Sequence, residues 1–178
     1  GKGGALYYMP SDFKREILWA SNGEFTGQQD VIDSLSEGAG FVFLSGHGSP
    51  TVWADHYPGV PGNRAYGSVT GLHTTNILRR PFIPIEKISN KDKPFILVVG
   101  CCQNSQFNVS IIPSVLDGIL DLSMWTYGAI APECFSWWFT RLRGRGAIAS
   151  IGNTGLGYGT LGGDSTIGGL DGGPRIVF

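Results

Sequence analysis

The strongest feature of the hydrophobic pattern is a set of short apolar runs. Phe41–Leu44 and Phe95–Val99 contain no polar residue, and the second of these runs follows a charged stretch and ends at Gly100. Ala147–Ile151 is a third run of similar style. Short unbroken apolar runs bounded by charge or glycine are typical of strands buried on both faces of a parallel sheet. The pattern therefore predicts three buried strands.

Helical periodicity appears on either side of these runs. Gln28–Glu37 carries a narrow apolar stripe and stops at Gly38, which is a common residue just past a helix end. Ala131–Arg143 begins with Pro132, which suits a first helical turn. In this second segment, residues spaced i, i+3, i+4, i+7 are apolar: Phe135, Trp138, Phe139 and Leu142. Both segments are predicted to be helices.

The remaining segments have weaker patterns. Ala5–Met9 resembles an edge strand, and Ile111–Leu122 has patchy helical spacing. Ser49–Asn90 contains several prolines and glycines, so we expect a long loop that lies over the end of the sheet. The segment 152–173 is dense in glycine and is expected to be a loop beside the site. We expect residues 1–178 to form one α/β domain, or a large segment of one that is truncated at both ends. The final apolar residues resemble the start of a further element, which favours a truncated segment.

The order of elements predicts a mostly parallel α/β sheet with helices on both faces and right-handed crossovers. At 178 residues and 42% apolar content, the chain is long enough to bury a core. A formal net charge of −1 gives no reason to expect nucleic acid or an anionic membrane as partner. No apolar run approaches the roughly 20 residues that a membrane span requires.

Candidate chemistry lies where two predicted strands end. Cys101 follows the run Phe95–Val99 and Gly100, while His47 and Gly48 follow Phe41–Leu44. Open α/β sheets bind ligands beyond the carboxyl ends of their strands. A histidine beside a cysteine favours the reactive thiolate. The alternatives are that Cys101 is a small buried core residue and that His47 is a loop residue bonded to backbone.

Four neighbouring residues are candidates for substrate contacts. Cys102 and Gln103 follow Cys101 directly, and Trp53 and Asp55 follow the His-Gly pair. Strand alternation predicts that Cys102 faces away from Cys101 and packs, and Asp55 could equally cap a turn. A zinc site is disfavoured because adjacent cysteines lack the usual ligand spacing, so no metal ligands are assigned.

Three blocks of this sequence resemble the gingipain-type cysteine peptidases, the C25 family, in the clan that also contains caspases and legumain. The blocks are FVFLSGHGSPTVW (Phe41–Trp53), PFILVVGCCQN (Pro94–Asn104) and PECFSWWFTRLRGRGAIASIGNTG (Pro132–Gly155). Their order and spacing match the family over roughly residues 28–158. By this resemblance Cys101 is the nucleophile, His47 is the catalytic histidine, and Gly48 offers an N–H to the oxyanion hole. The doubled cysteine raises Cys102 as an alternative nucleophile, but the small residue that directly precedes the nucleophile in the family matches Gly100–Cys101.

The resemblance implies a caspase/gingipain-like fold and an endopeptidase that cleaves polypeptides through a Cys-His dyad and an acyl-enzyme. It requires no cofactor, and a structural calcium ion is compatible with it. Other domains or chains of the same precursor are expected partners. A secreted or cell-surface location is expected, with a cytoplasmic one left open. Two alternatives to a peptidase remain: an inactive caspase-like interaction module, and a doubly wound binding domain without peptidase activity.

Overall fold

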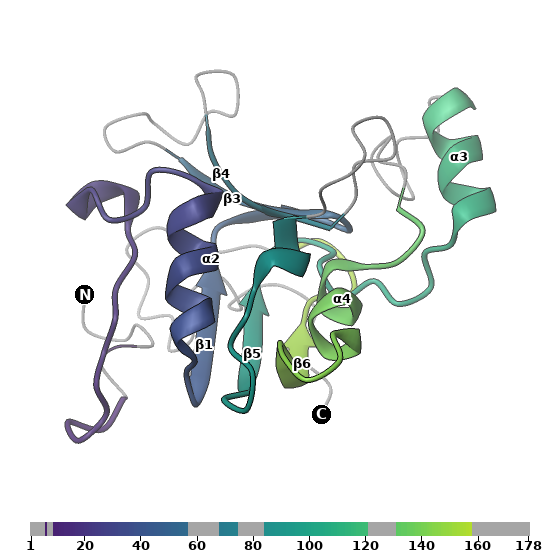
Figure 1. The fold of residues 1–178 in the computed structure, drawn as a ribbon. Coiled ribbons are helices and arrows are strands. Elements are labelled where there is room, and N and C mark those ends of the chain that lie inside the picture. The colour runs from purple at the N-terminus through teal and green to yellow at the C-terminus, as the bar shows by residue number, and fades with distance from the viewer. Residues whose placement is uncertain (1–5, 7–8, 57–67, 75–83, 121–130, 158–178) are drawn as a thin grey trace.

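The computed structural model describes residues 6, 9–56, 68–74, 84–120 and 131–157 (Figure 1). The helices are α2 (Gln28–Glu37), α3 (Ile111–Leu120) and α4 (Phe135–Arg141), with short 3-10 turns η1 (Ala20–Asn22) and η3 (Pro84–Lys87). The strands are β1 (Phe41–Ser45), β2 (His47–Ser49), β3 (Val52–His56), β4 (Ser68–His73), β5 (Phe95–Gly100) and β6 (Ala147–Gly152).

The three predicted strands are confirmed and form one parallel sheet in the order β1-β5-β6. The side chains of Phe95, Leu97 and Val99 alternate along β5 and are fully buried. Phe95 packs edge-on against Phe139 of α4, with ring centroids 5.9 Å apart. The core therefore forms where this face of the sheet meets the helices.

Both helices that pack on the sheet in the described part of the chain contribute to the same core. Val31 and Leu35 of α2 share one buried cluster with Leu97 and with Phe139 of α4. In the order β1-β5-β6, each later strand lies on the same side of the strand before it. When crossovers are right-handed and all step in the same direction, their connections cover the same face of the sheet. The other face leaves Ile96 exposed. The α/β class is as predicted, and the described helices α2 and α4 pack on one face of the sheet.

A second sheet replaces part of the long loop predicted for Ser49–Asn90. The strands β2, β3 and β4 pair antiparallel in sequence order. Figure 1 shows β3 and β4 across the end of the parallel strands. The loop prediction was wrong here because these strands are short and carry few of the apolar residues that mark a buried strand. The segment does lie over the histidine end of the main sheet, as expected.

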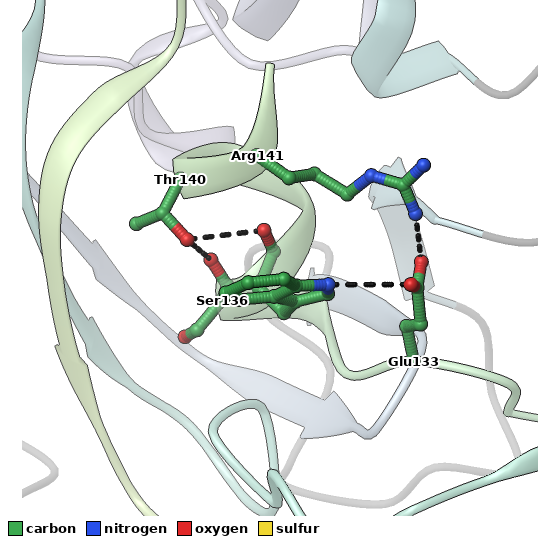
Figure 2. Close-up of polar contacts among 5 residues, drawn as sticks. Glu133, Ser136, Thr140 and Arg141 are labelled. Atoms are coloured by element: carbon green, nitrogen blue, oxygen red, sulfur yellow. Dashed lines mark hydrogen bonds and ion pairs between the residues drawn. The ribbon is translucent and has the colours of Figure 1, made fainter. Parts of the chain in front are cut away.

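The helices agree with the sequence in part. Helix α2 has the predicted bounds and ends at Gly38, whose φ of 87° is left-handed. Helix α4 is shorter than predicted because Cys134 is extended and acts as its N-cap. Glu133, just before it, accepts a hydrogen bond from Trp137 Nε1 (3.2 Å) and pairs with Arg141 (Figure 2). These contacts tie the start of the helix to its last turn.

Some predictions fall outside the described residues. The edge strand at Ala5–Met9 lies mostly there, and so does the glycine-rich segment beyond Gly157. Within the described part of the chain, no helix has both the length and the apolar content needed to cross a membrane.

Removing the aromatic ring at the centre of the core should be costly. Phe139 is fully buried and contacts both Phe95 and Phe135 edge-on. We expect Phe139→Ala to lower the free energy of unfolding by about 3–5 kcal/mol, because a buried ring is lost and a cavity remains. Urea denaturation measures the change. Ile148→Ala is the control, since this side chain is 67% exposed and its loss should cost no more than about 0.5 kcal/mol.

Candidate active site

The site is built where β1 and β5 end side by side. Ser45, the last residue of β1, is the parallel partner of Gly100, the last residue of β5. The chain then turns from β1 into the hairpin β2–β3, which begins with His47, and from β5 into the turn that begins with Cys101. The sheet therefore brings the histidine segment and the cysteine segment to one edge, as the sequence predicts.

Gly48 is packed directly against the cysteine turn. A Cβ at this position would lie 2.7 Å from the Cys102 carbonyl oxygen and 2.8 Å from Cys101 Cβ, and it would collide with Asn104 Oδ1. Only a residue without a side chain permits this approach of the two backbones. The His47–Gly48 segment and both cysteines therefore belong to one site.

Cys101 occupies the core side of this junction. Its side chain continues the buried face of β5, is 1% exposed, and directs Sγ toward the Leu44 carbonyl oxygen at 3.7 Å. Burial raises the pKa of the Cys101 thiol far above its ordinary value of 9.0, and the charges of Cys102 and Asp55 raise it further. The assignment of the nucleophile to Cys101 stays a prediction from the sequence.

Cys102 lies outside the two core clusters of the described residues and is 9% exposed. Its Sγ is 3.4 Å from both the nitrogen and the oxygen of Gly157, in the segment that follows β6. Gln103, next along the chain, adopts a left-handed φ of 55° and donates its N–H to Gly155 O at 2.8 Å. Cys102 and Gln103, which the sequence predicts to bind substrate, are therefore in contact with the start of the glycine-rich segment.

The turn after β5 is unusual because its polar residues are buried. Gln103, Asn104 and Ser105 are all buried, and within the described part of the chain the side-chain oxygens of Gln103 and Asn104 have no hydrogen-bond partner. Buried polar atoms without partners are rare in folded proteins. Asn104 was not predicted from the sequence; the polar run directly after an apolar strand is the signal that could have identified it.

Trp53 and Asp55 of β3 have different surroundings. Trp53 is buried, stacks on Phe25 with centroids 5.1 Å apart, and donates Nε1–H to Ser45 O at 3.2 Å. These contacts give it a structural role, which the sequence did not predict. Asp55 is partly buried, and both residues border a hollow of about 740 Å³ along the free edge of β1. The hollow also reaches Ser45, beside the site.

Among the described residues, no group of three or more histidine, cysteine or acidic side chains is arranged to hold a metal ion.

The fold defines an α/β protein in which a histidine segment and a cysteine segment meet at the carboxyl edge of the parallel sheet. The family model described as "Peptidase family C25" matches residues 4–169. The chain therefore belongs to peptidase family C25, as its resemblance to the gingipains predicted.

A solved structure entitled "Structure of Protease" is 25% identical in sequence, with a TM-score of 0.45. The match covers 71% of this chain and 18% of that one, so the chain spans less than a fifth of that protein. No curated protein matches the sequence.

A side chain at Gly48 should disrupt the packing of the His47–Gly48 segment against the cysteine turn. We expect Gly48→Ala to lower the free energy of unfolding by about 1–3 kcal/mol, because its methyl group overlaps atoms of both cysteines and of Asn104. Thermal denaturation and urea denaturation measure the effect. Gly27→Ala is the matched control, because nothing lies within 4 Å of a Cβ at Gly27. Equal stability of the two variants would contradict the close approach.

Burial of Cys101 predicts a specific dependence of stability on pH. Below its ordinary pKa of 9.0 the thiol is protonated in both the folded and the unfolded protein, so its contribution is constant. Above that pH it ionises only in the unfolded protein, which favours unfolding by up to about 1.4 kcal/mol per pH unit. Wild-type stability should therefore fall faster than that of Cys101→Ala between about pH 9 and pH 10.5. Parallel curves in urea denaturation would show that Cys101 ionises freely in the fold.

Proposed function

We propose that this chain carries the nucleophile and the histidine of a cysteine endopeptidase, with His47 as the proton-transfer residue and Cys102 as the reacting thiol. The observation that carries the proposal is the contact of the Gly48 backbone with both cysteines at the end of the parallel sheet. Membership in a peptidase family supports polypeptides as the substrate class.

Cys102 is favoured over Cys101 by burial and charge. Cys101 is almost inaccessible, and Asp55 acts on it with a charge that opposes ionisation. Cys102 begins the turn beyond the sheet, and the backbone of Gly157 lies against its sulfur. A nucleophile needs a path to the substrate. Both cysteines are buried, but Cys102 is 9% exposed and Cys101 only 1%, so Cys102 is the more accessible of the two.

The reaction follows from these placements. The Cys102 thiolate attacks the carbonyl carbon of the scissile bond, and the carbonyl oxygen takes the negative charge. The N–H of Gly48 and that of the nucleophilic residue are the donors proposed to bind this oxygen. The C–N bond then breaks, and the amine leaves with a proton from the His47 imidazolium. Water, losing a proton to His47, attacks the thioester, releases the acid and restores the Cys102 thiolate beside the His47 imidazolium.

Single substitutions test the assignment. Cys102→Ala and His47→Ala should each lower the rate of cleavage of fluorescein-labelled casein by on the order of 10³-fold or more, because the covalent step loses its nucleophile or its proton carrier. Cys101→Ala should keep most of the activity and serves as the matched control. Circular dichroism establishes that each variant is folded.

Two results would overturn the assignment. Loss of activity in Cys101→Ala with activity kept in Cys102→Ala would identify Cys101 as the nucleophile. Absence of cleavage of any substrate by the wild-type protein, together with slow alkylation of both thiols by iodoacetamide, would favour an inactive interaction module of the same fold.

A further inference from the structure

Asn104 links the cysteine turn to the hairpin that carries His47. Its side chain is 0% exposed, and Nδ2 donates to Ser49 O at 2.8 Å and to Val52 O at 3.0 Å. These two carbonyl groups flank the turn between β2 and β3. A single amide therefore spans the base of the turn and holds the hairpin against the turn after β5.

The other carbonyl groups of the hairpin turn are bound by different elements. Pro50 O accepts from the N–H of Phe135 at 2.7 Å, and Thr51 O accepts from the N–H of Thr74 at 2.9 Å. Those contacts attach the turn to α4 and to the end of β4. The hydrogen bonds of Asn104 connect the turn to the segment that holds both cysteines.

The position of Asn104 is itself fixed. Its carbonyl oxygen accepts the N–H of Ser136 at 2.9 Å, and Gln103 before it is held in a left-handed conformation. The side-chain Oδ1 is buried, has no hydrogen-bond partner among the described residues, and faces the Cα of Gly48 closely enough to exclude a Cβ there. Gly48 and the adjacent His47 are thus set in place from the cysteine side by one rigid side chain.

We propose that Asn104 is a positioning residue that sets the distance between His47 and the reacting thiol, a role that rests on the proposed peptidase function. It does not touch the substrate or the reacting atoms. When the amide is removed, the hairpin keeps its ties to α4 and β4 but loses both hydrogen bonds from the cysteine turn. The histidine then supports the thiolate less well.

Asn90 provides a matched control within the same fold. It is 2% exposed, and Nδ2 donates to Lys93 O at 2.7 Å and to Gly146 O at 2.9 Å, while Oδ1 accepts from Gly146 N at 2.6 Å. Lys93 and Gly146 precede β5 and β6, so Asn90 clamps the opposite end of the sheet. Asn90→Ala removes a comparable set of buried hydrogen bonds far from the cysteines.

The experiment measures the rate of Cys102 alkylation by iodoacetamide against pH in the whole protein, with the modified residue identified by mass spectrometry. His47→Ala defines the profile of a thiol without its histidine. Asn104→Ala should approach that profile, with alkylation near pH 6 slowed by on the order of 10-fold to 100-fold, the size of effect expected for misplaced groups. Asn90→Ala should keep the wild-type profile although its melting temperature falls.

The outcomes separate the two claims. If His47→Ala alters the profile and Asn104→Ala behaves like Asn90→Ala, the positioning role is wrong and the proposed function stands. If His47→Ala leaves the profile unchanged, the proposed function fails, and the positioning role fails with it. Asn104→Asp is the second variant should Asn104→Ala not fold. It keeps the side-chain volume while placing an acceptor opposite the Ser49 and Val52 carbonyls, and a wild-type profile in this variant would also overturn the proposal.

Discussion

The structure depends on the parallel pairing of β1 with β5. That register aligns Ser45 with Gly100, so both strands stop at the same level and both chains leave the sheet at the same edge. Parallel strands cannot be joined by a tight turn, and the long connection this requires contains the antiparallel strands β2, β3 and β4. The hairpin that carries His47 is therefore part of the crossover itself. One constraint of sheet geometry supplies both halves of the proposed site.

The site is held together by polar contacts as well as by the hydrophobic core. The core packs α2 and α4 on one face of the sheet and also includes Cys101 and Trp53 of the hairpin. Beyond Cys101, Asn104 binds the hairpin and Asn153 Nδ2 donates to the Cys101 carbonyl oxygen at 3.1 Å. Buried amides hold backbone groups at fixed distances and directions, whereas apolar packing is less directional. This division explains why polar residues follow an apolar strand and are nonetheless buried.

The sequence predicted the elements with a simple apolar pattern and missed those without one. The parallel strands were identified because their apolar runs are unbroken, and α2 was identified because its apolar residues follow the helical period. The strands β3 and β4 were not predicted because Trp53 is their clearest apolar residue, and Trp53 is buried by stacking on Phe25, which lies in a distant segment of the chain. The choice between the cysteines was difficult for a related reason. A strand that reads as apolar on both faces has no alternation, so nothing in the sequence shows that Cys101 shares the core face with Phe95, Leu97 and Val99.

The most direct test of the central claim is a crystal structure of the protein after reaction with a panel of peptidyl chloromethyl ketones that differ in their first side chain. The account predicts a covalent bond from Cys102 Sγ to the inhibitor, with the His47 imidazole beside that sulfur and the inhibitor oxygen facing the Gly48 N–H. A bond to Cys101, or a labelled Cys102 with His47 directed away from it, would contradict the account.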